Sequence, residues 1–276
     1  MRSDMPRLSV ITGAYNANEC PHFRKSIESI LNQSFTDFEF IICDDGSTDN
    51  TLEILKKYAQ ADSRLIILQN DKNLGLAPTL NRCIEAAQGE YIARHDCDDF
   101  SASTRFEKQI SYLDSHPKTA ILGTSIYLFD ENGVQSKETM PERVSPKDFF
   151  FNNPYKHGTV IFKRSALLRA GGYSTEKRCV RNEDYDLFMR MQLFSVGENL
   201  SEPLYYFFED KKAMKRRKYR YRINETLVRF RGFKKLGLMP RAFPYVIKPL
   251  IVGLIPRFLL KRIQSRRRAK LNKRNL

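Results

Sequence analysis

The first hundred residues alternate between short apolar runs and longer stretches in which apolar residues recur every three or four positions. The short runs are rich in β-branched residues and end in polar turns, which is typical of buried strands. The longer stretches have the period of an amphipathic helix. The pattern predicts strands within 8–16, 38–50, 64–70 and 91–94, and helices within 20–33, 51–61 and 76–89.

Strands and helices that alternate in this order predict an α/β fold with a mostly parallel sheet flanked by helices. In such sheets, ligands bind beyond the carboxyl ends of the strands. Three polar turns fall at those ends: GAYN at 13–16, DDGSTDN at 44–50 and HDCDD at 95–99. We therefore expect the three turns to meet in one crevice.

The pattern is less regular in the second half of the chain. It predicts helices within 103–116 and 182–194, and a strand and hairpin within 120–140 that turns near Asn132 and Gly133. A strand followed by a short helix is expected within 157–173. The first 210 residues are interpreted as one domain, and residues 211–276 as a basic, amphipathic and helical extension.

In this extension, Ile223, Leu227 and Phe230 are predicted to share one face of a helix. The following stretch, 243–263, is more apolar, but Lys248 interrupts it and Pro249 and Pro256 are expected to break it. A transmembrane helix needs about 20 consecutive apolar residues. The stretch is therefore interpreted as an interfacial segment that lies on a membrane.

The HDCDD turn places Asp96, Asp98 and Asp99 within four positions. Carboxylates this close repel one another, so they are either solvated, for example as helix caps, or they bind a cation. The turn follows a buried strand at the carboxyl end of the sheet, which favours the cation. Mg²⁺ and Mn²⁺ prefer oxygen ligands, and Mg²⁺ often shares them with substrate phosphates.

Two further acidic positions are candidates for chemistry. Asp45 follows the second strand, where it can accept hydrogen bonds from the ring N–H groups of a ligand, although Ser47 and Asp49 in the same turn are also typical of a helix cap. Glu183 and Asp184 begin a predicted helix. They either complement the helix dipole or include a base that removes a proton from a hydroxyl group.

The charge of the chain is unevenly distributed. The formal net charge is +15, but residues 211–276 hold 23 Lys and Arg and one acidic residue, Glu225, so the rest of the chain is acidic. This asymmetry indicates a polyanionic partner for the extension, either nucleic acid or an anionic membrane. Five cysteines without a CxxC pair indicate reduced thiols in a cytosolic protein.

Several motifs occur together in a fixed order: LSVITGAYN, CDDGSTDNT, NLGLAPTLNRCIEAAQGEYIARHDCDDF, HGTVIFKRSALLRAGGY and NEDYDLFMRM. Over residues 6–208 this set resembles glycosyltransferase family 2, the inverting nucleotide-sugar transferases with the GT-A, Rossmann-like fold. The chain contains no Trp and therefore no Q-x-x-R-W signature of the processive members. The resemblance implies a non-processive enzyme of the bacterial polysaccharide type.

The resemblance also implies roles for residues at matching positions. Ala14 and Tyr15 lie in the loop that contacts the nucleobase, and Asp45 matches the carboxylate that pairs with the base. Asp96 and Asp98 match the D-x-D motif.

Asp98 is then the expected direct ligand of Mn²⁺ or Mg²⁺, with Asp96 closer to the ribose and metal, and Asp99 is expected to be more open. Asp184 matches the general base of the E-D pair, and His157 matches a histidine near the donor phosphates or the acceptor.

The implied donor is a nucleotide-diphosphate sugar, with a UDP-sugar favoured, and the implied acceptor is a lipid-linked glycan. The extension would then hold a cytoplasmic enzyme peripherally on the inner face of the cell membrane. A nucleic-acid-binding protein that uses the basic extension is the alternative. That alternative leaves the three carboxylate turns without a purpose, so no nucleic-acid partner is expected.

Overall fold

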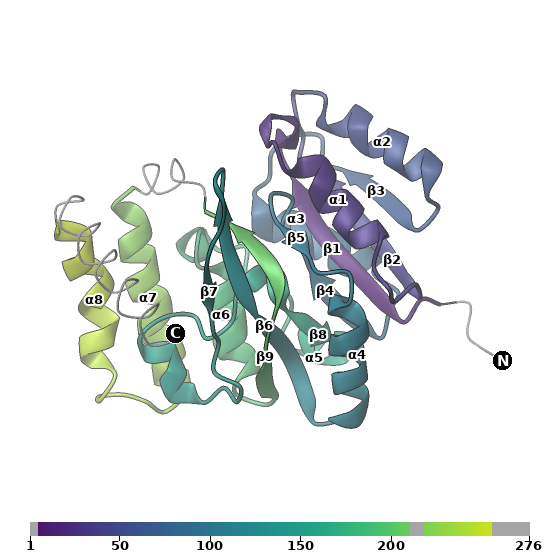
Figure 1. The fold of residues 1–276 in the computed structure, drawn as a ribbon. Coiled ribbons are helices and arrows are strands. Elements are labelled where there is room, and N and C mark those ends of the chain that lie inside the picture. The colour runs from purple at the N-terminus through teal and green to yellow at the C-terminus, as the bar shows by residue number, and fades with distance from the viewer. Residues whose placement is uncertain (1–4, 210–217, 256–276) are drawn as a thin grey trace.

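The computed structural model describes residues 5–209 and 218–255 (Figure 1). In this part of the chain the strands are β1 (Leu8–Ala14), β2 (Phe38–Asp44), β3 (Leu65–Gln69), β4 (Tyr91–Arg94), β5 (Phe100–Ser101), β6 (Thr119–Asp130), β7 (Gly133–Glu138), β8 (Ile161–Lys163) and β9 (Val196–Phe208). The α-helices are α1 (Phe23–Leu31), α2 (Thr51–Ala61), α3 (Leu76–Ala86), α4 (Arg105–Ser115), α5 (Arg164–Arg169), α6 (Glu183–Met191), α7 (Arg220–Lys235) and α8 (Phe243–Leu254). Short 3₁₀ helices span Ala17–Glu19, Pro146–Phe150, His157–Thr159 and Lys177–Cys179.

Within these residues the strands form a single nine-stranded sheet in the order β3-β2-β1-β4-β8-β6-β9-β5, with β7 paired to β6. Strands β3, β2, β1 and β4 are parallel, as the alternation of strands and helices predicts. Beyond β4 the sheet is mixed, because β8 is antiparallel to both β4 and β6, whereas β9 is parallel to β6. The α/β fold class is confirmed.

Side chains that alternate along the strands divide the interior into two layers. Ile11 and Ile41 face α3 and α6, whereas Val10 and Phe40 face α1, α2 and α4. Because strands buried on both faces need apolar residues at nearly every position, β1 and β2 read as continuous apolar runs. Figure 1 shows the result, with helices on both sides of the sheet.

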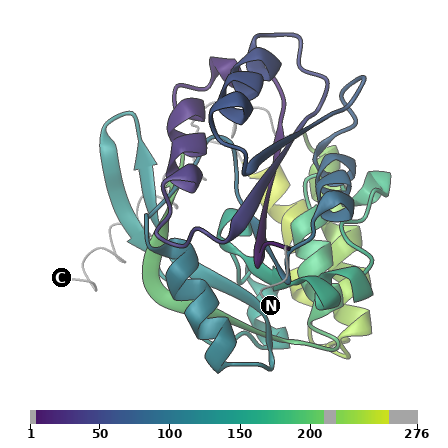
Figure 2. The ribbon, with the colours of Figure 1, turned by 90° about the vertical axis from the view of Figure 1, so that its right-hand side faces the viewer.

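The β6–β7 hairpin turns between Asp130 and Gly133, as expected, and it projects from the body of the molecule in Figure 2. The longest strand, β9, is not predicted by the sequence pattern. It contains Gly197 and Pro203, and its pairing with β6 shifts register at three places. These irregularities remove the regular alternation by which a strand is recognised.

Helices α7 and α8 pack against the rest of the protein. Val228 and Phe233 of α7 and Val246 of α8 are buried in the same hydrophobic cluster as Phe188 of α6. Gly232 lies so close to α6 that an added Cβ would be 2.3 Å from the sulfur of Met189. The division of the chain at residue 211 remains a prediction, but the described part of the extension shares its core with the body.

The predicted amphipathic face of the extension is present in α7, where Ile223, Leu227 and Phe230 are between 42% and 46% exposed. Pro249 was expected to break the apolar stretch, but it lies inside α8, which continues to Leu254. Pro256 lies outside the described residues. No helix in the described ranges is long and apolar enough to cross a membrane.

Candidate active site

The first two polar turns meet at the carboxyl ends of β1 and β2. Ala14 is the last residue of β1, and its carbonyl oxygen accepts a hydrogen bond of 2.7 Å from the backbone N–H of Asp45. Ala14 is buried, whereas the side chain of the next residue, Tyr15, is half exposed. An exposed ring beside a strand end can stack on a nucleobase, so the geometry is compatible with the predicted role of Tyr15.

The Asp45 carboxylate is already extensively hydrogen-bonded within the protein. It accepts bonds from the backbone N–H groups of Leu74 and Gly75, at 2.8 and 2.9 Å, and from the Asn70 amide at 2.7 Å. These bonds tie the end of β2 to the loop that begins α3. Recognition of a base by Asp45 stays a prediction.

Asp44 is a residue that the sequence analysis did not single out. Its side chain is fully buried at the end of β2, where Oδ2 accepts a bond from the Ser47 backbone and Oδ1 has no hydrogen-bond partner in the described part of the chain. Buried carboxylate oxygens are almost always hydrogen-bonded. The D-D pair itself was the available signal, and Asp44 belongs among the candidates for ligand binding.

The acidic turn after β4 contains carboxylates in different environments. Asp96 and Asp98 are partly exposed, and the side chain of Asp96 forms an ion pair with Arg94. Asp99, which was expected to be more open, is instead buried and accepts a 2.7 Å hydrogen bond from the backbone N–H of Phe208. Burial, together with the charges of Asp98 and Asp96, raises the pKa of Asp99 well above its usual range. Its role is to attach the turn to the end of β9.

Arg94 is a second residue that the sequence analysis missed. Its side chain is 1% exposed, and within residues 5–209 and 218–255 only one of its three guanidinium nitrogens has a partner, Asp96. Burial alone would lower the pKa of Arg94, but the Asp96 charge opposes it and the net pKa is raised, so the side chain remains cationic. From sequence alone, an arginine at the end of a predicted strand is expected to be exposed. The fold shows that Arg94 is instead buried beside the acidic turn.

His157 lies against the same turn. Its Nε2 is 2.7 Å from the hydroxyl of Tyr173, and burial, assisted by the charge of Arg94, lowers its pKa well below the usual value. His157 is therefore neutral at physiological pH. The next residue, Gly158, has no room for a side chain, because an added Cβ would be 3.0 Å from Oδ2 of Asp96 and 2.2 Å from the hydroxyl of Tyr205. The 3₁₀ turn thus packs directly onto the acidic turn.

Asp184 lies in the first turn of α6, and its Oδ2 accepts a 2.8 Å hydrogen bond from the Asn153 amide. Burial raises its pKa, although hydrogen bonds from the Tyr185 backbone and Asn153 oppose the shift. A general base works best when its pKa is close to the operating pH, and a raised pKa moves an aspartate toward that condition. Glu183 beside it is also buried, with a raised pKa.

The fold brings three of the predicted site residues, Asp96, Asp184 and His157, toward one another. Burial is the main cause of the raised pKa values of Asp184 and Tyr173, and the charge of Asp96 adds to both. The hydroxyl of Tyr173 bonds to His157. Ala14, Tyr15 and Asp45 lie at the ends of β1 and β2, one and two strands away from β4 along the sheet. Since neighbouring strands are about 4.8 Å apart, both groups border the same carboxyl edge.

The carboxylates at this edge suit a divalent metal ion only when a substrate supplies the remaining ligands. Among residues 5–209 and 218–255, no group of three or more His, Cys, Asp or Glu side chains is placed to hold a metal ion. Mg²⁺ is commonly bound through one or two carboxylates together with water and substrate phosphates. The partly exposed Asp96 and Asp98 fit that kind of site.

A parallel half-sheet extended by antiparallel strands, with carboxylates gathered at its carboxyl edge, places the protein in the GT-A fold class. The fold is similar to S. aureus TarS residues 1–349 in complex with UDP-GlcNAc, with a TM-score of 0.69 at 22% identity over 88% of this chain and 74% of that one. It is also similar to the mannosyltransferase PcManGT from Pyrobaculum calidifontis in complex with GDP-Man and Mn²⁺, with a TM-score of 0.59 at 18% identity over 98% and 81% of the two chains.

The chain belongs to Glycosyl transferase family 2, whose model matches residues 9–174. It is 39% identical over 264 residues to the putative glycosyltransferase EpsE of Bacillus subtilis, covering 95% of this chain and 94% of EpsE. It is 30% identical over 190 residues to the Escherichia coli enzyme WfaP, a UDP-Glc:alpha-D-GlcNAc-diphosphoundecaprenol beta-1,3-glucosyltransferase, covering 68% of this chain and 70% of WfaP. The predicted family is confirmed, and the protein is a glycosyltransferase.

Proposed function

We propose that this glycosyltransferase moves a sugar, with inversion, from a nucleotide-diphosphate sugar to a hydroxyl group of a lipid-linked saccharide during synthesis of a cell-surface polysaccharide. The observation that carries the proposal is the cluster of Asp96, Asp184 and His157 at the carboxyl edge of the sheet. An inverting transfer needs one base near the acceptor and a separate environment for the departing diphosphate. Asp184 and the acidic turn after β4 supply these two environments.

In the proposed reaction, Asp184 removes the proton from the acceptor hydroxyl as the oxygen attacks the anomeric carbon. The new C–O bond forms on the face opposite the departing nucleoside diphosphate, so the configuration inverts. Asn153 orients the carboxylate through its hydrogen bond to Oδ2. Neutral His157 can donate or accept a hydrogen bond with an acceptor or phosphate oxygen without adding charge to the site.

Asp98 and Asp96 are proposed to hold Mn²⁺ or Mg²⁺ together with the donor diphosphate. The bound ion would neutralise negative charge on the departing diphosphate. Arg94 keeps the Asp96 carboxylate paired from its buried side. Tyr15 and Asp45 are proposed to contact the nucleobase, with the loop held by Asp45 forming part of that surface.

A UDP-sugar is the favoured donor, because UDP-GlcNAc is bound in TarS and WfaP uses UDP-Glc. The lipid-linked acceptor is inferred from WfaP, which acts on a diphosphoundecaprenol-linked sugar.

A thermal-shift screen of UDP-, GDP- and dTDP-sugars with Mn²⁺ tests the donor. A ligand present at 100 times its Kd stabilises the folded state by about 2.7 kcal/mol, so one nucleotide class should raise Tm by several degrees. The shift should shrink when EDTA replaces Mn²⁺. If no nucleotide sugar stabilises the protein in either condition, the proposed function is wrong.

The extension is proposed to hold the enzyme peripherally on the inner, cytoplasmic face of the membrane. On α7, the apolar stripe of Ile223, Leu227 and Phe230 is exposed and lies between Arg220 and Lys234, which are exposed on the same side of the helix. An amphipathic helix of this kind binds at the boundary of headgroups and acyl chains. Residues 256–276, which carry much of the basic charge, lie outside the described part of the structure.

The double variant Leu227→Gln and Phe230→Gln should weaken binding to anionic vesicles by about tenfold or more, because each side chain loses the gain from apolar burial. Vesicle co-sedimentation measures the loss. The matched control is Leu193→Gln, which changes an exposed leucine outside the extension and should leave binding unchanged. Absence of vesicle binding combined with salt-dependent DNA binding would instead favour the nucleic-acid alternative.

A further inference from the structure

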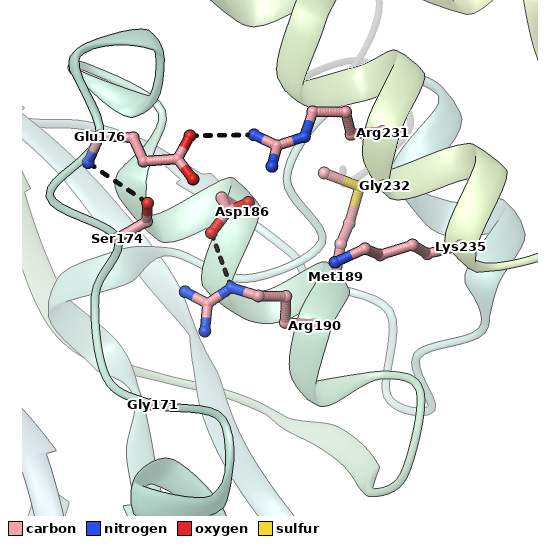
Figure 3. A pocket seen from close by; sticks show the side chains of 9 residues that line it. All are labelled: Gly171, Ser174, Glu176, Asp186, Met189, Arg190, Arg231, Gly232 and Lys235. Carbon is pink, nitrogen blue, oxygen red and sulfur yellow. Dashed lines mark hydrogen bonds and ion pairs between the residues drawn. The ribbon is translucent and has the colours of Figure 1, made fainter.

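A polar cavity lies away from the candidate active site, between the loop after α5, the outer face of α6, and α7 (Figure 3). Its volume is about 270 Å³. Its lining consists of Gly171, Ser174, Glu176, Asp186, Met189, Arg190, Arg231, Gly232 and Lys235. Asp186 follows Asp184 by two positions on α6, so the two carboxylates lie on nearly opposite faces of the helix. The cavity is therefore distinct from the proposed reaction centre.

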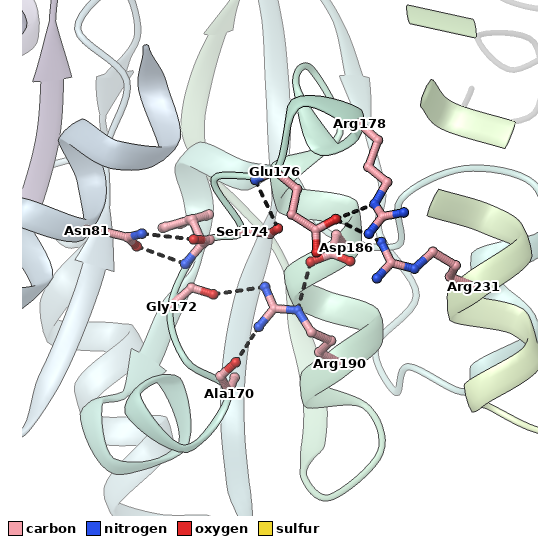
Figure 4. A network of polar contacts seen from close by, with 10 residues as sticks. Asn81, Ala170, Gly172, Ser174, Glu176, Arg178, Asp186, Arg190 and Arg231 are labelled. Carbon is pink, nitrogen blue, oxygen red and sulfur yellow. Dashed lines mark hydrogen bonds and ion pairs between the residues drawn. The ribbon is translucent and has the colours of Figure 1, made fainter. Parts of the chain in front are cut away.

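Part of the charge in this cavity has a structural role. Arg190 forms a 2.7 Å ion pair with Asp186, and its guanidinium also donates to the carbonyl oxygens of Ala170 and Gly172 (Figure 4). These bonds hold the glycine turn after α5, where Gly172 has a φ of +65°. The Asp186–Arg190 pair is neutral overall, so the net charge of the cavity depends on the remaining side chains.

The remaining side chains carry an excess of positive charge. Glu176 is shared between Arg178 and Arg231, which lower its pKa to about 2, so its carboxylate stays ionised and neutralises only one of the two cations. Lys235 extends from α7 toward α6 (Figure 3) and has no salt bridge within the described ranges. The cavity lining thus holds three cations and two anions, a net charge of +1. Arg178, which pairs with Glu176 from outside the lining, brings the charge of the surrounding cluster to +2.

The cavity lies beside the surface proposed to contact the membrane. Arg231 and Lys235 are about one helical turn apart. Each comes directly after an exposed residue on the side of α7 that carries the apolar stripe: Arg231 follows Phe230, and Lys235 follows Lys234. A step of one residue rotates the side chain by about 100°, which places Arg231 and Lys235 on the flank of the apolar stripe. An anionic group at the membrane surface would therefore meet this flank when the stripe is buried.

We propose that the cavity is a binding site for a phosphate-bearing lipid headgroup. A phosphate monoester carries up to two negative charges, which match the net +2 of the cavity lining and Arg178 together. Arginine forms paired hydrogen bonds to phosphate oxygens, and lysine binds phosphate as a point charge. The volume is below the 300–1,000 Å³ typical of pockets for larger organic ligands, and it suits a headgroup better than a whole lipid. The inference rests on the proposed membrane association and is independent of the transfer chemistry.

The test compares two kinds of vesicle at equal surface charge, with phosphatidylcholine as the background lipid. One contains phosphatidic acid, a phosphate monoester, and the other contains phosphatidylglycerol, a diester. The full-length protein should bind the phosphatidic acid vesicles about tenfold more tightly, the gain expected from one additional charge-assisted hydrogen bond. Lys235→Gln should remove most of this preference, and the double variant Arg231→Gln and Lys235→Gln should remove all of it.

Lys234→Gln is the matched control, because it removes the same charge from the neighbouring position of α7 without changing the cavity. It should keep the preference and lower binding to both vesicles equally. An equal affinity of the wild type for the two vesicles, or the same preference in Lys235→Gln and Lys234→Gln, would overturn the inference. Thermal melts of each variant confirm that it is folded.

A soluble source of phosphate is distinguished by adding millimolar inorganic phosphate. If it abolishes the vesicle preference and raises Tm in the wild type but not in Lys235→Gln, the site takes free phosphate and the lipid assignment is wrong. If the preference persists, the headgroup is supported. The donor screen tests a different site, so failure of the proposed sugar transfer would leave this vesicle preference unchanged.

Discussion

Asp184→Asn is expected to lower kcat for sugar transfer by about 10²–10⁴-fold, the usual contribution of a general base. Asparagine keeps the shape of the side chain and can retain a hydrogen bond with Asn153, but it cannot accept the proton of the acceptor. Donor binding should be nearly unchanged, since the proposed contacts to the nucleotide lie elsewhere. Steady-state transfer assays together with donor titrations separate the two effects.

The same variant should change the pH profile. Burial raises the pKa of Asp184, so in the wild type the carboxylate becomes protonated, and loses its basic form, at a higher pH than an ordinary aspartate near 3.9. As the pH falls through this raised pKa, kcat/KM of the wild type should decline. In Asp184→Asn this acidic limb should disappear.

Glu183→Gln is the companion variant, because Glu183 precedes Asp184 on α6 and also has a raised pKa. We expect Glu183→Gln to lower kcat less than Asp184→Asn does and to keep the acidic limb of the pH profile. The reverse order would assign the base to Glu183. Near-normal turnover in both variants would contradict the proposed use of a base in this turn of α6.

Asp98→Ala is expected to weaken Mn²⁺-dependent donor binding by more than the roughly 10–100-fold that changes around a metal site usually cost. The substitution removes a carboxylate proposed to bind the ion directly. Calorimetric titration of the donor with Mn²⁺ measures the loss. The same titration in EDTA is the internal control, since the wild type and the variant should then bind the nucleotide with similar affinity.

The outcome that would contradict this assignment is specific. If Asp98→Ala retains the full Mn²⁺ enhancement of donor binding, the ion is not held through Asp98. If the wild type itself binds and transfers equally well in EDTA, the proposed metal dependence is wrong for this enzyme.

Local patterns were sufficient to predict the first half of the molecule. Strands β1 and β2 are buried on both faces, so their apolar runs identify them from sequence. In the helices that follow these strands, apolar residues recur with the period of a helix. Parallel strands place their carboxyl ends at one edge, so the three polar turns could be expected to lie together. The ordered motifs then predicted the family, which the comparison with known proteins confirms.

Tertiary structure decided the environments of the individual side chains. Asp99 is adjacent to Asp98 in sequence, but the end of β9, more than a hundred positions away, buries it and donates to its carboxylate. Arg94 is an ordinary strand residue in sequence, and only the fold buries its side chain and pairs it with Asp96.

The cavity beside α7 likewise joins the loop after α5 with helices α6 and α7, which are separated along the chain. The sequence by itself determined the regular strands and helices and the edge at which the polar turns gather, because periodicity is a local property. It did not predict β9, whose pairing is irregular. Burial, ion pairing and pKa depend on which distant segments pack against a residue, and only the folded chain decides them.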